Sequence, residues 1–289
     1  MSLVEIACDE SGYEGEKLIG GVTDVFAHAA VALDKETSAA CVAELRERIR
    51  SPATEYKANH VLRSKHRPVL LWLLGPNGPL LGQAQVQLVD KAYFLVSQLT
   101  GQLIGQPADD LYRAGRHKAG WDDFLEAAND LLRARDKVDV LYEALDRLEI
   151  TSDTVQALKQ SRPRAEALLR EDPPVIPPLD PLMRAIARAV ENWGEHSRWV
   201  AIAHDRQTTL SPERIAQLQA GTALARLELV HSFTDSRIQV ADFLAGVARK
   251  IASDQLKGDD DAELTALIRP YVDPRSVWGD LASWERLAS

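Results

Sequence analysis

Residues 3–12 read LVEIACDESG, an apolar run that ends in two carboxylates, a serine and a glycine. Apolar and β-branched residues that stop at Ser-Gly predict a strand over residues 3–9, followed by a turn. Asp9 would then lie at the end of a buried strand, where an unpaired carboxylate costs several kcal/mol. The segment therefore predicts a core strand of an α/β fold and a carboxylate that needs a partner.

Two further carboxylates occupy comparable places. Asp205 ends the run WVAIAHD at residues 199–205, and Asp242 lies inside IQVADFLAGVA at residues 238–248, a pattern that predicts a mostly buried helix. Three such carboxylates, spread over the whole chain, indicate a shared partner. A divalent cation is the simplest candidate, because it can neutralise all three at once.

The sequence around these runs predicts further strands and helices of an α/β sheet. Helix-start signals occur at Asp34 or Thr37-Ser38, at Ser211-Pro212 and at Thr234-Asp235-Ser236. The expected strands span residues 3–9, 18–25, 26–33, 199–203 and 225–233, and the expected helices span residues 37–49, 211–220 and 237–252. The order β-β-β-α-β-α-β-α is that of ribonuclease H, so we expect an α/β fold with a ribonuclease H-like mixed five-stranded sheet.

The middle of the chain has a helical pattern. Apolar residues recur near a period of 3.6 over residues 85–103, 121–135 and 138–148. We therefore expect a single ribonuclease H-like domain formed by residues 1–60 and 196–255, with a large helical insertion at residues 61–195. Residues 256–289 are expected to form a C-terminal helical extension.

The composition is that of an ordinary globular protein, with 289 residues, 45% hydrophobic and 27% charged. The chain begins without a signal-peptide pattern and contains no apolar run long enough to span a bilayer, so we expect a cytoplasmic protein with no membrane partner. Cys8 and Cys41 lack any motif spacing and are expected to be reduced and buried.

The charge pattern bears on nucleic-acid binding. The net charge of −9 argues against indiscriminate binding of phosphates. Basic residues are nevertheless dense at residues 46–67 and 113–118, which leaves room for a local basic groove. Either stretch is also explained by a solvated helix face.

In the ribonuclease H order of elements, the first and fourth strands are neighbours in the sheet, so Asp9 and Asp205 would lie side by side. The last helix packs across the sheet and would bring Asp242 close to both. Glu55, just after the first helix, is the expected fourth acid. Hard divalent cations prefer carboxylate oxygens, and two such ions can drive an in-line phosphoryl displacement. We therefore expect a Mg²⁺ or Mn²⁺ site.

At these residues the chain resembles the bacterial family catalogued as domain of unknown function 3800, in the ribonuclease H-like clan. The resemblance rests on Asp9-Glu10-Ser11-Gly12, Glu55-Tyr56-Lys57, Asp205-Arg206-Gln207 and Asp235-Ser236 with Gln239-Val240-Ala241-Asp242. It covers both ends of the chain in the right order and leaves the helical middle unmatched. It implies a ribonuclease H-like fold and a metal site, but no defined substrate.

We expect Asp9, Glu55, Asp205 and Asp242 to act as metal ligands and catalytic residues of a metal-dependent nuclease or phosphoryl-transfer enzyme acting on DNA or RNA. Lys57 and Arg206 are expected to contact the phosphate backbone. Supporting roles fall to Glu10, which points to the opposite strand face from Asp9; to Asp235, which caps the last helix; and to Gln239, which is positioned to orient Asp242.

Structural explanations stay open for each acid. Asp9 and Asp205 can form turns, Glu55 can be an exposed acid, and Asp242 can form a buried salt bridge with Arg206 or Lys57. A catalytically silent ribonuclease H-like binding protein is therefore the alternative. The glycines of this chain lack the spacing of an actin-like nucleotide binder, so that class is ranked low. A haloacid-dehalogenase-type phosphatase is excluded, because it needs a second Asp two residues after the first and Ser11 stands there.

Overall fold

A computed structural model describes residues 2–50, 57–134, 137–174, 177–195, 198–259 and 261–288. It contains a mixed five-stranded sheet in the order β3-β2-β1-β4-β5. The strands are β1 (Leu3–Ser11), β2 (Val25–Val31), β3 (Ala84–Asp90), β4 (Trp199–Asp205) and β5 (Leu224–Val230). Only β2 runs antiparallel to its neighbours in this sheet, so the carboxyl ends of β3, β1, β4 and β5 share one edge. The expected α/β class and five-stranded mixed sheet are confirmed.

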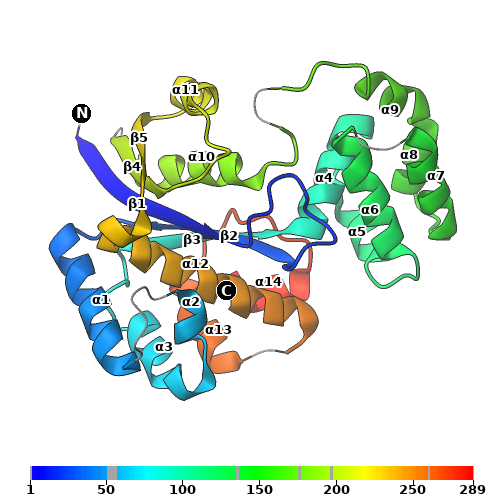
Figure 1. Cartoon of the computed structure of the whole chain (residues 1–289). Coiled ribbons are helices and arrows are strands. Elements are labelled where there is room, and N and C mark those ends of the chain that lie inside the picture. The colour runs from blue at the N-terminus through cyan, green and yellow to red at the C-terminus, as the bar shows by residue number, and fades with distance from the viewer. Residues whose placement is uncertain are drawn as a thin grey trace.

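One face of the sheet is covered by the helices drawn below it in Figure 1, with α12 lying across the strands. Alternate residues of β2 and β3 share a core with the apolar side of α12. The elements of this layer are α1 (Lys35–Ile49), α2 (Ala58–Val61), η1 (Ser64–His66), α3 (Arg67–Leu74), α12 (Ser236–Lys257), α13 (Ala262–Ile268), η3 (Arg269–Tyr271) and α14 (Leu281–Ala288).

The opposite face packs against α10 and is continuous with a group of helices that extends beyond the sheet (Figure 1). Ile6, Cys8 and Phe26 join this second core. Its helices are α4 (Lys91–Ile104), α5 (Asp109–Gly115), α6 (Trp121–Leu132), α7 (Val138–Arg147), α8 (Asp153–Gln160), α9 (Arg162–Leu168) and α10 (Pro181–Trp193). Between β4 and β5 lies α11 (Pro212–Gly221), and η2 (Ser232–Thr234) precedes α12.

The expected helix starts are confirmed. The carboxylate of Asp34 accepts the Thr37 N–H at 2.7 Å and begins α1, while Ser211 caps α11 and Asp235 caps α12. The first and fourth strands are neighbours, as expected, and both cysteines are free and buried. Within the described residues, no helix is long and apolar enough to cross a membrane.

Two predictions about the strands are wrong. Residues 18–25 and 26–33 do not form two strands, because only Val25–Val31 pairs in the sheet. The third strand is instead Ala84–Asp90, which overlaps the first residues of the helix expected at residues 85–103. The range 61–195 is therefore not wholly helical, and its first strand completes the sheet beside β2.

Gly246 brings α12 close to α2. A Cβ at position 246 would lie 2.2 Å from the Cβ of Ala58, so α2 would have to move. Gly246→Ala is expected to destabilise the fold by about 1–3 kcal/mol, measured by urea denaturation. Gly101→Ala, in α4, is the control, because a Cβ there meets nothing within 4 Å. It should stabilise by roughly 0.5–1 kcal/mol through its helix propensity. Equal effects of the two changes would contradict close packing at Gly246.

Candidate functional site

Two carboxylates lie near the carboxyl ends of adjacent central strands, with Asp9 two residues before the end of β1 and Asp205 at the end of β4. Strands β1 and β4 are parallel, with Cys8 opposite His204, so Asp9 and Asp205 are the next pair along. Asp9 also lies opposite Ala29 of β2, and Ala29 belongs to the core beneath α12. Because side chains alternate along a strand, Asp9 and Asp205 both face the α12 side of the sheet.

Asp242 approaches the same place from α12. One turn further along that helix, Gly246 lies near Ser11, whose Oγ would be 3.9 Å from an added Cβ. Arg249 donates from Nε to the same Oγ at 2.9 Å. This part of α12 therefore runs beside the end of β1. The half-buried Asp242, one turn earlier, lies close enough to Asp9 for its charge to raise the pKa of Asp9.

Electrostatics connect the three acids, which we call the carboxylate cluster (Asp9, Asp205 and Asp242). Asp9 is only 4% exposed. Burial raises its pKa well above the usual range, and the charges of Glu10, Asp242 and Asp205 raise it further. The Glu10 N–H donates to Oδ1 of Asp9 at 2.7 Å and partly opposes this rise. The cluster is thus a group of mutually repelling carboxylates around a buried acid.

Asp205 is held by the loop that follows β5. Its Oδ1 accepts the backbone N–H of Ser232 at 3.0 Å. The same loop is tied to α12, because Gln239 donates from Nε2 to the Ser232 carbonyl at 2.9 Å. The amide of Gln239 thus fixes the loop beside Asp205, and its expected role in orienting Asp242 stays a prediction.

Asp235 caps α12 and pairs with Arg237. It accepts the Arg237 backbone N–H at 3.0 Å and the guanidinium at 2.6 Å. Burial acts to raise the pKa of Asp235, but the bonds from Arg237 outweigh it and the pKa is lowered. Asp235 therefore caps α12, as predicted, and it also forms an ion pair that was not predicted.

Glu10 lies on the opposite face, as predicted, but in a group that sequence reasoning missed. Its Oε2 is 3.7 Å from Nε2 of the fully buried His204, and Gln207 donates to its Oε1. His204 directs Nδ1 to the Asp205 carbonyl at 2.8 Å and Nε2 to Nε2 of His28 at 3.3 Å. Because a carbonyl oxygen can only accept, the contact with Asp205 assigns a proton to Nδ1 of His204. Burial and then His204 lower the pKa of His28 well below its usual value.

The remaining predicted site residues are only partly described. Glu55, the expected fourth acid of the metal site, lies outside the described residues. Lys57 is half-buried at the start of α2, and Arg206 is exposed, with Nη1 3.2 Å from Nε2 of His231.

The basic stretches carry less free charge than their sequences indicate. At residues 46–67, Arg48 pairs with Glu44 at 2.6 Å and Arg67 pairs with Glu263 at 2.6 Å. In the second stretch, Arg116 pairs with Asp280 at 2.7 Å. Ion pairing therefore weakens the case for a broad basic groove on these segments.

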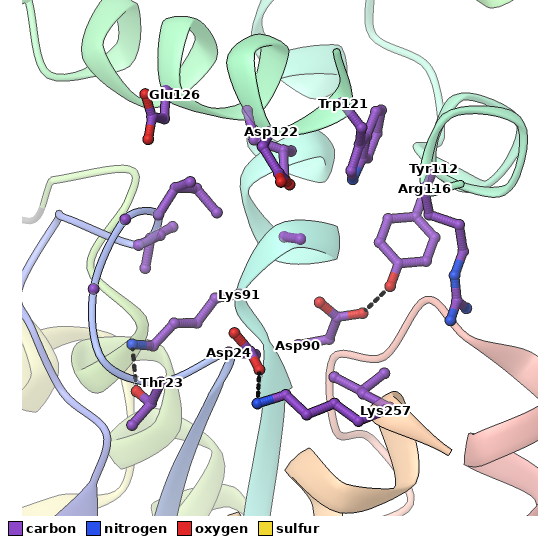
Figure 2. A pocket seen from close by; sticks show the side chains of 17 residues that line it. Thr23, Asp24, Asp90, Lys91, Tyr112, Arg116, Trp121, Asp122, Glu126 and Lys257 are labelled. Atoms are coloured by element: carbon purple, nitrogen blue, oxygen red, sulfur yellow. Dashed lines mark hydrogen bonds and ion pairs between the residues drawn. The ribbon is translucent and has the colours of Figure 1, made fainter. Parts of the chain in front are cut away.

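A cavity of about 620 Å³ lies elsewhere on the same edge of the sheet, where α12 ends beside the junction of β3 and α4. Figure 2 shows Tyr112 reaching Asp90, a bond of 2.5 Å, and Lys257 reaching Asp24, at 2.8 Å. Lys91 turns instead to Thr23 (Figure 2). Asp90 lies opposite Val25, four residues along β2 from the partner of Asp9, so this cavity and the carboxylate cluster are separate.

The described side chains do not form a ready metal cage. Among them, no three His, Cys, Asp or Glu groups are placed so that they could hold one ion. Asp9 and Asp205 each have one oxygen bound to a backbone N–H. Binding of an ion by the cluster would therefore require its carboxylates to draw together.

No known family, curated protein or solved structure matches the chain. The resemblance through Asp9-Glu10-Ser11-Gly12 and the other three motifs stays a prediction from the sequence.

Proposed function

We propose that the chain is a divalent-metal-dependent phosphoryl-transfer enzyme that cleaves nucleic acid at the carboxylate cluster. One observation carries the proposal: Asp9, Asp205 and Asp242 come from distant parts of the chain to one face of the sheet. Burial raises the pKa of Asp9, and the charges of Glu10, Asp242 and Asp205 raise it further. Folded proteins rarely keep like charges together in a buried place without a function or a counterion.

The sheet supports a ribonuclease H-like fold for this enzyme. The order β3-β2-β1-β4-β5, with β2 alone antiparallel, agrees with that fold. Helices α1 to α3 come between β2 and β3, which departs from the expected succession of three strands. The proposed family, domain of unknown function 3800, rests on the four sequence motifs.

The cluster fits Mg²⁺ or Mn²⁺ better than a softer metal, because its donors are carboxylate oxygens. Asp9, Asp205 and Asp242 would hold the cation, with Glu55 as the expected further ligand. When bound, such ions activate a water and stabilise the leaving oxygen of a phosphodiester. The ions would also offset the burial and the carboxylate repulsion that raise the pKa of Asp9.

The surrounding residues have positioning roles in this proposal. Ser232 holds one oxygen of Asp205, and the Glu10 N–H holds one oxygen of Asp9, so each carboxylate keeps a second oxygen for the ion. Arg206, exposed directly after Asp205, would contact the phosphate backbone. Lys57, at the start of α2, is the second expected phosphate contact.

A cleavage assay tests the proposal. Labelled single-stranded, duplex and hybrid oligonucleotides are incubated with the protein in Mn²⁺ or in EDTA. We expect cleavage only with Mn²⁺, and a loss of at least about a hundredfold in Asp205→Asn and Asp242→Asn, since each removes a charged ligand. Asp122→Asn is the matched control, because this exposed acid lies at the cavity of Figure 2.

Absence of cleavage on every substrate would refute the enzyme. Isothermal titration calorimetry with Mn²⁺ then tests whether the chain binds metal at all. If Mn²⁺ does not bind either, the chain is the catalytically silent binding protein of the same fold.

A further inference from the structure

An exposed aromatic ring lies next to the carboxylate cluster. Phe233, in η2, is 68% exposed, the highest value for an aromatic side chain among the exposed hydrophobic residues of the described chain. Its ring stacks on His231, with the ring centroids 5.0 Å apart and an interplanar angle of 29°. A ring held in this way against another ring, yet open to water, can accept a further planar group on its exposed surface.

Arg206 adds a positive, planar group to the same site. Its Nη1 lies 3.2 Å from Nε2 of His231, so the guanidinium donates to that ring. Arg206, His231 and Phe233 together form what we call the stacking platform. All three are exposed.

The stacking platform is fixed to the cluster by the backbone. Ser232, between His231 and Phe233, donates its N–H to Asp205 at 3.0 Å. Arg206 is the residue directly after Asp205. A nucleotide whose phosphate reaches the carboxylate cluster therefore has an aromatic surface for its base on the same loop that binds Asp205.

We propose that the stacking platform binds an unpaired nucleobase, which makes single-stranded nucleic acid the preferred substrate class. The proposal rests on the proposed function. A base in a duplex is already stacked on its neighbours, whereas an unpaired base gains a partner on Phe233. The guanidinium of Arg206 favours the adjoining phosphate, which offsets locally the repulsion from a chain of net charge −9.

Fluorescence anisotropy in EDTA measures binding without cleavage. A labelled single-stranded oligonucleotide is titrated with the wild type, Phe233→Ala and Phe233→Trp at one fixed low salt concentration. We expect Phe233→Ala to weaken binding about five- to a hundredfold, the usual contribution of one stacked base, and Phe233→Trp to retain it. Duplex binding should change less than twofold. Leu281→Ala is the control, since this 57% exposed side chain lies in α14.

The possible outcomes separate the two proposals. Cleavage in Mn²⁺ with unchanged single-strand affinity in Phe233→Ala overturns the stacking platform and leaves the enzyme standing. Weaker single-strand binding in Phe233→Ala, without any cleavage by the wild type, supports the platform and refutes the enzyme. Equal weakening for duplex and single strand, or no binding of either, overturns the platform. If the wild type self-associates and Phe233→Ala abolishes that association, the ring binds a second copy of the chain. That result also overturns the stacking platform.

Discussion

Asp9→Asn is expected to abolish nucleic-acid cleavage and at the same time to stabilise the metal-free protein. The loss of activity should be at least about a thousandfold, or roughly 4 kcal/mol, because the central charged ligand is removed. The gain in stability should be about 1–2 kcal/mol in EDTA at neutral pH, because the variant replaces an acid whose ionisation is opposed by burial and by the neighbouring carboxylates. The amide oxygen can still accept the Glu10 N–H.

The pH dependence of this gain has a definite sign. The pKa of Asp9 is raised in the folded protein, so the folded state binds a proton more strongly than the unfolded chain does. Stability from this group is therefore present below the unfolded value and is lost as pH rises toward the raised folded value. Urea denaturation in EDTA should show the wild type and Asp9→Asn converging in acid and diverging toward neutral pH.

Adding Mn²⁺ should make the wild type more stable than Asp9→Asn, the reverse of their order in EDTA. Mn²⁺ at about a hundred times its dissociation constant should stabilise the wild type by about 2.7 kcal/mol and leave Asp9→Asn unchanged. The exposed Asp122→Asn should behave as the wild type in both buffers. A destabilised Asp9→Asn in EDTA would contradict the repulsion, and an equal response of both proteins to Mn²⁺ would exclude Asp9 as a ligand.

The acids of the candidate site stand out in the sequence more clearly than the third strand of the sheet does. Asp9, Asp205 and Asp242 each interrupt an apolar run, and this local anomaly is visible without a structure. Strand β3 carries no such signal. Val86 and Leu88 alternate toward the α12 core, yet Val86 and Val89 also fit a helical period, and α4 starts directly at Lys91. A short apolar run fits both the strand period of 2 and the helix period of 3.6, so only the pairing with β2 shows that these residues form a strand.

The groups that the sequence did not predict depend on contacts between distant segments. His28 and His204 are 176 residues apart and meet only because β1 pairs with both β2 and β4. Nothing around either histidine indicates this contact, since each lies in an ordinary apolar strand. The register of the sheet brings them beside Glu10, and register is a property of the whole fold.

A second group of this kind is the buried ion pair of Lys91 and Glu14. The Lys91 side chain is 1% exposed, and its ammonium donates to Glu14 at 2.6 Å and to Thr23 at 2.8 Å. Burial lowers the pKa of Lys91 while Glu14 opposes this. Burial acts to raise the pKa of Glu14, but the bond from Lys91 and the Val22 N–H outweigh it and lower the pKa. Each charge thus depends on the other.

Glu14→Gln is expected to destabilise the protein by about 3–5 kcal/mol, because it leaves the buried ammonium without a counter-charge. Lys91→Met should cost less, since Glu14 is 24% exposed at its side chain and can be hydrated. The double variant should be more stable than Glu14→Gln alone, because the uncompensated charge is gone. A double-mutant cycle by urea denaturation measures this coupling, and strictly additive changes would show that the pair contributes nothing.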